Sequence, residues 1–358
     1  MRSSRKTNLP QTIRYASVLA KIGAQRSNLL SDTKLKTLAD SKTLPDFAGQ
    51  LRDTPYQEQI AKIPPPFTGH KLERAFNENL IETCQKIIKY SPKVAKEYLS
   101  LYLLRFEVEN IKMLIKLTST NASPEQKLAR LYPFVGRYIE KPALLEDAAK
   151  SVDLTHLVEV FKKTVYWQPL NMGLASYNES GSTKGLDVFV DVFFYEHLYE
   201  AFERLPKKEK SSALFYAGPE NDGFVLLTLL RGKNFNYDPN WLRIAVPNNY
   251  LRLTKQQVDA ILSAIDFDAA YKIVQETEYA KYFVKEDTIE DTLTKAEKAL
   301  RKTTIDHAYA NKISIAFNIG MPLAYLTRKE TEVYNLRALA LGIDGGMVPD
   351  VIRAQLFG

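Results

Sequence analysis

The chain has 358 residues, 45% of them apolar and 25% charged, which is enough to build a globular protein with a buried core. Its single cysteine, Cys84, excludes an intramolecular disulfide, and no apolar run approaches the roughly 20 residues that a membrane-spanning helix needs. The net charge of +7 permits contact with anionic lipid, nucleic acid or acidic protein. Because basic and acidic residues alternate along most of the chain, we expect an ordinary mixed surface.

The amino-terminal segment carries Arg2, Arg5 and Lys6. No apolar stretch follows these basic residues, so a signal peptide is not predicted. We therefore expect a cytoplasmic protein that is either soluble or peripherally attached to a membrane.

A repeated tripeptide, Thr-x-Tyr, occurs three times in the chain, with threonines 110 and 113 residues apart. Counting back from each threonine, apolar residues stand at offsets of three, seven and ten, which trace one face of a helix. A residue type that caps helix N-termini stands eleven back, and an apolar pair at sixteen and nineteen back marks a preceding helix. The tripeptides are Thr54 to Tyr56, Thr164 to Tyr166 and Thr277 to Tyr279, and the caps are Thr43, Asp153 and Asp266. Each copy thus predicts a helical hairpin with a Thr-x-Tyr tail.

Long helical stretches are predicted after each hairpin, over about residues 72–117, 186–231 and 289–341. Candidate linkers are the three prolines at 64–66 and the Ser/Gly-rich segment 177–185. Glycines at 342–346 should end the last long helix, and a short helix should follow over about 349–357. No strand pattern accumulates, so the fold class is all-α, with helical lobes at 1–118, 119–232 and 233–358. Such units would pack around a pseudo-threefold axis or as a curved array.

A second pattern lies on the first and third long stretches. Each instance has an acidic residue, an asparagine three later and a base two after that: Glu107, Asn110 and Lys112, then Glu332, Asn335 and Arg337. The middle copy keeps an acid, Asp222, but has no asparagine. The spacing indicates an acid and a base near one another on the helix surface, with the asparagine bonded to a neighbouring turn.

The last element, with Pro322 to Leu326 before it, closely resembles the C-subunit family of archaeal and bacterial A/V-type ATP synthases, which are relatives of the d subunits of vacuolar ATPases. The resemblance covers essentially the full length. It implies a funnel of three pseudo-equivalent lobes that sits on the cytoplasmic mouth of the membrane proteolipid rotor ring. There it would receive the central shaft and couple hydrogen or sodium ion transport to ATP synthesis or hydrolysis, without catalysis of its own. We expect Glu107, Glu332 and their neighbours to act structurally between long helices rather than to touch the shaft.

Side chains that could carry chemistry form no recognisable site. The histidines, His70, His156, His197 and His307, are scattered and match no metal motif, and no phosphate-binding loop is present. Asp187 and Asp191 lie four apart, as on a solvated helix face. We therefore predict no catalytic, cofactor-binding or metal-binding residue.

Two alternative functions remain open at this point. The 20 tyrosines and the basic balance allow nucleic-acid binding by base stacking. A helical scaffold of some other complex is the second alternative, and of the two it has the stronger support.

Overall fold

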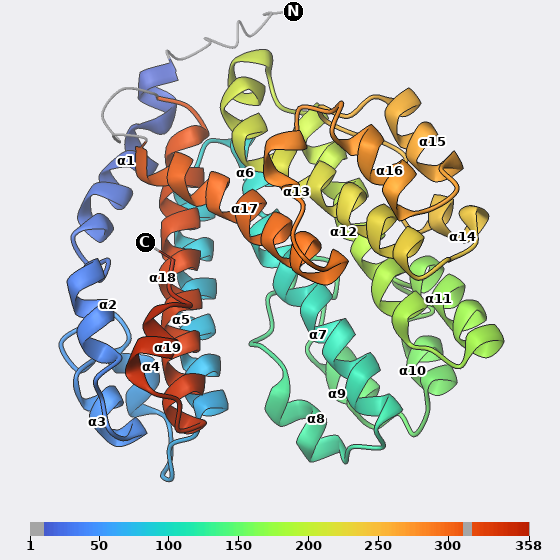
Figure 1. The fold of residues 1–358 in the computed structure, drawn as a ribbon. Coiled ribbons are helices and arrows are strands. Elements are labelled where there is room, and N and C mark those ends of the chain that lie inside the picture. Colours follow the sequence, from blue (N-terminus) through green and yellow to red (C-terminus); the bar gives the residue numbers. More distant parts are fainter. Residues whose placement is uncertain (1–10, 311–316, 358) are drawn as a thin grey trace, which may run out of the picture. The chain divides into compact units, whose positions relative to one another are not determined.

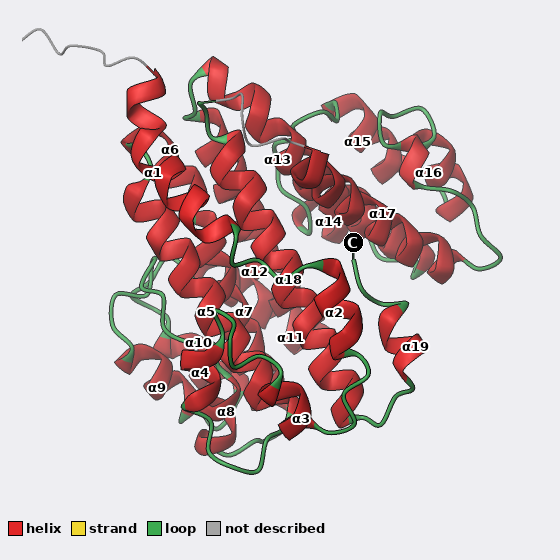
Figure 2. Cartoon of the chain, turned by 90° about the vertical axis from the view of Figure 1, so that its left-hand side faces the viewer, coloured by secondary structure: helices red, strands yellow, loops and turns green. Residues whose placement is uncertain are grey.

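The computed structural model describes residues 11–310 and 317–357, and every regular element in these ranges is a helix (Figures 1 and 2). The all-α prediction is confirmed. None of the helices described is both long and apolar enough to cross a membrane.

The chain divides into two compact units by its internal contacts. Unit 1 comprises residues 1–100, 205–213 and 305–358, and unit 2 comprises residues 101–204 and 214–304. The last segment of the chain therefore belongs with the first. The division into three lobes with boundaries at 118 and 232 stays a prediction.

Unit 1 is built around two long helices that run antiparallel. Gly69, at the start of one, donates its N–H to the carboxylate of Asp344, at the end of the other, over 2.8 Å. The two are α5 and α18, and α1 packs against both (Figure 1). The helices of unit 1 are α1 (Gln11–Arg26), α2 (Asp32–Leu38), α3 (Leu44–Gly49), α4 (Gln57–Ala61), α5 (Gly69–Tyr90), α6 (Lys93–Leu99), α18 (Gly320–Asp344) and α19 (Pro349–Arg353).

Unit 2 contains two helical hairpins and the long helices that support them. In its first half α12 packs along both α7 and α11, and in its second half Leu226, Val258, Phe267 and Leu293 share one apolar core. Its elements are α7 (Leu101–Ser119), α8 (Pro124–Arg130), α9 (Ala143–Ala149), α10 (Leu154–Val160), α11 (Trp167–Ser180), α12 (Lys184–Glu203), α14 (Pro239–Ile244), α15 (Lys255–Ser263), α16 (Phe267–Val274) and the 3-10 turn η1 (Ala280–Tyr282). Helices α13 (Lys207–Asn234) and α17 (Ile289–Ala310) contribute residues to both units.

The three predicted hairpins are confirmed as α2–α3, α9–α10 and α15–α16. Thr43, Asp153 and Asp266 cap the second helix of each, because each side chain accepts the N–H of the residue three positions on. The apolar residues at the shared offsets are buried, including Phe47, Leu157 and Ala270 at seven back. The repeated spacing therefore encodes the face that each hairpin turns inward.

The long stretches are more interrupted than predicted. Pro92 and Pro206 separate α5 from α6 and α12 from α13, since proline supplies no N–H for the helical ladder. Residues 311–316 of the third stretch lie outside the described residues. The last helix, α19, ends at Arg353, earlier than expected, whereas the predicted end of α18 at its glycines is confirmed, with Gly346 at φ +67°.

The predicted linker at 177–185 is shorter than expected. Helix α11 continues to Ser180 and α12 begins at Lys184, so only three residues connect them. Gly181 makes this tight connection possible with φ +70°, a conformation that glycine adopts without strain. The small residues that indicated a linker instead allow close packing: a Cβ added to Gly173 would lie 2.6 Å from the Cα of Leu186. The predicted break at 64–66 is confirmed as the loop between α4 and α5.

Candidate functional site

The Thr-x-Tyr tripeptide forms a compact turn at the end of each hairpin. In the first copy, the Thr54 hydroxyl donates to the carbonyl oxygen of Leu51 over 2.6 Å and accepts the N–H of Tyr56 over 3.4 Å. Thr164 and Thr277 make the same two bonds in their copies. The threonine therefore satisfies the end of the helix and fixes the direction of the tyrosine.

Each of the three tyrosines points into the interior and donates its hydroxyl to a buried carboxylate. The bonds join Tyr56 to Glu332 (2.5 Å), Tyr166 to Glu107 (2.9 Å) and Tyr279 to Asp222 (2.9 Å). We call these pairs, with the groups bonded to their carboxylates, the first, second and third junctions. All six side chains are at most 3% exposed. The junctions bring together residues from both sequence patterns, which had no evident connection in the sequence.

In the second junction a loop of the main chain wraps the carboxylate. Glu107 accepts the N–H groups of Arg137, Tyr138 and Ile139 at 2.6 to 3.2 Å, in addition to the Tyr166 hydroxyl. This loop leads into the α9–α10 hairpin. One carboxylate on α7 therefore anchors both the entry and the exit of the hairpin.

The third junction repeats this arrangement with a shorter side chain. Asp222 on α13 accepts the N–H groups of Leu251, Arg252 and Leu253 at 2.7 to 3.0 Å, together with the hydroxyl of Tyr279. An aspartate thus replaces the glutamate without loss of a donor. The middle copy of the sequence pattern keeps its acid in the same structural role.

The first junction has different donors. Glu332 on α18 accepts a single described main-chain N–H, that of Leu30 (2.5 Å), and the ammonium of Lys329 over 2.8 Å. Lys329 also donates to the Tyr56 hydroxyl over 2.8 Å and lies over its ring. Here a buried lysine takes the place of main-chain donors. The α2–α3 hairpin, the first along the chain, is thus anchored by α18, the last long helix of the chain.

The electrostatics of the junctions keep the tyrosines neutral. Burial, followed by the adjacent carboxylate, raises the pKa of Tyr56, Tyr166 and Tyr279 well above the ordinary value of 10.0. Burial lowers the pKa of Lys329, while the Glu332 carboxylate opposes that change. The tyrosine hydroxyls are therefore permanent donors at neutral pH rather than acid or base catalysts.

The two asparagines of the second pattern bind returning segments of chain. Asn110 exchanges two hydrogen bonds with the peptide groups of Tyr132, at 2.7 and 3.2 Å, and Asn335 does the same with Phe357, at 2.7 and 2.9 Å. Each partner lies 22 residues later, so the predicted bond to a neighbouring turn is wrong. Val225 holds the corresponding position in the middle copy and is buried in the apolar core.

The bases of the second pattern do not pair with its acids, and that prediction is also wrong. Lys112 bonds to Asp191 on α12 (3.0 Å) and to Glu109, and Arg337 pairs with Glu73 on α5. Five residues rotate a helical position by about 140°, so acid and base face different neighbours. The bases link long helices side by side, whereas the acids anchor loops.

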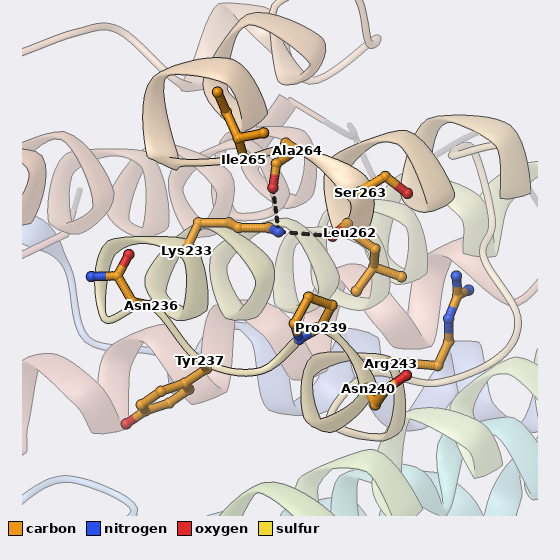
Figure 3. A pocket seen from close by; sticks show the side chains of 10 residues that line it. All are labelled: Lys233, Asn236, Tyr237, Pro239, Asn240, Arg243, Leu262, Ser263, Ala264 and Ile265. Atoms are coloured by element: carbon orange, nitrogen blue, oxygen red, sulfur yellow. Dashed lines mark hydrogen bonds between the residues drawn. The ribbon is translucent and has the colours of Figure 1, made fainter.

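Figure 3 shows a hollow of about 490 Å³ in unit 2, beside the turn between α15 and α16. Lys233 crosses it and donates to the carbonyl oxygens of Leu262 and Ala264 at 2.7 and 2.6 Å. Arg243, also in its wall, is bonded to Asp259. Lys233 thus fixes the turn and Arg243 links α14 to α15, and burial lowers the pKa of Lys233. The hollow brings together no nucleophile and base.

The comparisons with known proteins identify the family. A model of the ATP synthase (C/AC39) subunit family matches residues 18–355. The chain belongs to this family. Three curated relatives are named as C subunits of A-type ATP synthases: those of Methanocaldococcus jannaschii (26% identical, covering 96% of this chain and 86% of the relative), Thermococcus kodakarensis (24%, 95% and 89%) and Desulfurococcus sp. (25%, 95% and 89%). The resemblance drawn from the sequence is confirmed, and the chain is a subunit of a rotary ATPase.

In this C/AC39-family chain, the other acidic residues singled out in the sequence contribute to helix packing and capping. The expectation that Asp187 and Asp191 lie on a solvated face is wrong: both are half-buried, and Asp191 faces Lys112. Burial raises the pKa of Asp187 to about 6. Asp153 caps α10 by accepting the N–H of His156, as predicted. Within residues 11–310 and 317–357, no three His, Cys, Asp or Glu side chains are placed to hold a metal ion.

Sequence reasoning missed the main-chain donors of the junctions and the lysines that fix the hairpin turns. Lys127 donates to the carbonyl oxygen of Ser151 over 2.6 Å, as Lys233 does to the equivalent Ala264. A signal for the donor loops was present, because Leu30, Ile139 and Leu253 stand 24 or 25 residues before the three threonines. The two sequence patterns of this chain thus supply the two partners of each junction, the tyrosine and the carboxylate.

Proposed function

We propose that the chain is the non-catalytic central-stalk component of an A/V-type ATP synthase or ATPase, which couples the membrane proteolipid rotor ring to the central shaft during ion-driven rotation. The observation that carries this proposal is the family match over residues 18–355, which spans both compact units. On this proposal the protein acts at the cytoplasmic face of the membrane. Its partners are the ring and the shaft, and it needs no cofactor.

The junctions support a mechanical role. A part that transmits torque must keep its loops fixed to its long helices, and a carboxylate that accepts three or four hydrogen bonds in the interior provides such a connection. Glu107 accepts four groups and Asp222 accepts five, the fifth being the side-chain amide of Asn221, and all the participating side chains are buried. A buried junction cannot reach a substrate, but it can keep a hairpin in a fixed position under load.

We further propose that three pseudo-equivalent lobes form a funnel around a pseudo-threefold axis. The same tyrosine–carboxylate pair occurs three times, which supports three equivalent lobes. Because the first hairpin is anchored by α18, the equivalent lobes would each begin with a long helix and end with the hairpin that follows it. The first lobe would then join the two ends of the chain.

The test removes the protein from the assembled complex. Inverted membrane vesicles from cells that lack the gene should lose ATP-driven ion transport, while the catalytic head keeps ATP hydrolysis. A plasmid copy of the wild-type chain should restore transport, and the tagged chain should co-purify with both ring and shaft proteins. Unchanged transport without the chain would overturn the proposal. Co-purification with other proteins but not with the ring would instead identify a scaffold of another complex.

A further inference from the structure

The positive charge of the chain is concentrated in three segments. Residues 1–26 contain six basic residues and no acidic one, residues 83–96 contain four and none, and residues 205–213 contain three and one. Their net charge of +12 exceeds the +7 of the whole chain, so the remaining residues are net negative by five. The expectation of an evenly mixed surface is therefore wrong for these segments.

The described parts of these segments meet at one end of unit 1. Lys21 on α1 and Lys89 on α5 both lie near the ring of Tyr90, with their ammonium groups 5.1 and 5.9 Å from its centroid. Glu209, at the start of α13, accepts the N–H of Ile319 before α18 and contributes, after burial, to raising the pKa of Tyr15 on α1. In both views, α1, α6 and the start of α13 lie toward the same end of the unit (Figures 1 and 2).

We call this region the basic end of unit 1 and define it by Lys21, Lys86, Lys89, Lys93, Lys207 and Lys208. All are exposed except Lys21, which is half-buried. In the part of the chain that the structure describes, none of the six forms an ion pair, whereas Lys112, Lys150, Lys162 and Lys295 all do. The one acid among these segments, Glu209, is buried. The positive potential of this end is therefore not cancelled within the unit.

The composition of this end favours one kind of anion. Six of its basic residues are lysines, with Arg14 and Arg26 also on α1, and lysines act as point charges on flexible stems without the planar fork with which arginine grips a single carboxylate or phosphate. They are spread over four helices, α1, α5, α6 and α13, rather than gathered in a pocket. Two apolar groups are also accessible on these helices, the exposed side chain of Ile13 on α1 and the partly exposed ring of Tyr90 at the end of α5. A flat array of negative headgroups with an apolar layer beneath matches this combination.

We propose that the basic end of unit 1 binds the headgroups of acidic phospholipids at a membrane surface. This interaction is separate from the coupling of ring to shaft and does not depend on it. It gives the isolated protein an affinity for the membrane, and it orients unit 1 with the start of α1 toward the lipid.

The test uses the purified full chain and flotation with vesicles of phosphatidylcholine, with or without phosphatidylglycerol. We expect binding only to the vesicles that contain phosphatidylglycerol, and weaker binding at high salt, because salt screens the attraction. Reversing Lys86, Lys89 and Lys93 to glutamate should reduce binding by roughly tenfold or more, because each lysine near the surface contributes to the attraction for anionic lipid. Thermal melts check that the variants fold.

A matched control separates location from net charge. Lys163, Lys272 and Lys298 in unit 2 are also exposed and also form no ion pair in the described residues, so their reversal changes the net charge equally. This control should bind vesicles like the wild type. Equal loss in both variants would show a net-charge effect and overturn the proposal. So would a failure to bind any vesicle combined with salt-sensitive binding to polyglutamate, which would assign the surface to an acidic protein.

Discussion

The first junction and the other two solve the same problem with different donors. In the second and third junctions, three consecutive main-chain N–H groups and a tyrosine surround the carboxylate. In the first, the carboxylate of Glu332 bonds to Leu30, Tyr56 and the buried ammonium of Lys329. The difference shows that the charge of the carboxylate can be balanced either by peptide dipoles or by a full cation. We therefore expect the two kinds of junction to respond differently to substitution.

The largest effect is expected for Glu107→Ala in the second junction. It leaves three main-chain N–H groups and the Tyr166 hydroxyl buried without an acceptor, at a cost of about 3 to 5 kcal/mol in the free energy of unfolding. Urea denaturation measures the loss. Glu109→Ala is the control, since Glu109 is exposed on the same helix and should cost less than about 0.5 kcal/mol. A loss below about 1 kcal/mol for Glu107→Ala would show that the junction contributes little to stability.

In the first junction, the effects of substituting Glu332 and Lys329 on stability should be coupled, which has no counterpart in the other two junctions. Glu332→Gln leaves the Lys329 ammonium buried without its carboxylate, which should cost about 2 to 4 kcal/mol. Adding Lys329→Met removes the stranded charge, so the double variant should melt at a higher temperature than Glu332→Gln alone. Reversal by Glu332→Lys should be worse than either. A double variant no more stable than the single one would show that Lys329 is not what distinguishes this junction.

Removing single hydroxyls should have smaller effects. Tyr166→Phe and Tyr279→Phe each remove one hydrogen bond to a carboxylate, at about 1 to 2 kcal/mol, and Tyr56→Phe should cost more because its hydroxyl also accepts from Lys329. Chemical denaturation of the three variants measures the order. Tyr90→Phe, at a partly exposed ring, is the control and should be nearly neutral. A smaller loss of stability for Tyr56→Phe than for the other two variants would contradict the proposed difference between the junctions.

The same tyrosines predict a loss of stability in alkali. Their pKa values are raised in the folded state, so their contribution is complete below the ordinary value of 10.0 and is lost as the pH rises above it, when unfolded tyrosine ionises. The cost of Tyr166→Phe should therefore shrink above pH 10, because phenylalanine cannot ionise. Melting temperatures from pH 8 to 11 measure this trend, and a cost that is independent of pH would contradict it.

The smallest effect is expected for Asp187→Asn on α12, outside the junctions. The pKa of Asp187 is raised to about 6, so its ionisation opposes folding as the pH rises through that value. Asparagine should therefore stabilise the protein at pH 7.5 by less than about 1 kcal/mol, because the group is partly exposed, and should have little effect at pH 4. Stabilisation that is equal at both pH values would show that charge is not the cause.

The sequence was sufficient for the hairpins because their caps and buried faces follow local rules. Thr43, Asp153 and Asp266 each act within three residues, and a period of 3.6 needs only one helix to be visible. The acids at Glu107 and Glu332 also stood out, but their partners did not. Main-chain donors have no side-chain signature, since any non-proline residue supplies an N–H. The same spacing argument failed for Lys112 and Arg337, where helix rotation directs acid and base to different neighbours.

Pairing across the whole chain was beyond any local rule. Leu30 and Glu332 are 302 residues apart, and a search for repeats that reads from one end to the other assigns each hairpin to the helix that follows it. The contacts assign it to the helix before, and the first hairpin to the last helix. Only the folded chain shows that order.

That arrangement also sets an order of events during synthesis. The second and third hairpins can be completed soon after they leave the ribosome, because Glu107 and Asp222 have already been made when their loops and tyrosines emerge. The α2–α3 hairpin has no such partner until α18 is finished. It must wait, incompletely anchored, while nearly the entire chain is translated, and its apolar face is open to chaperones or to mispairing for that time.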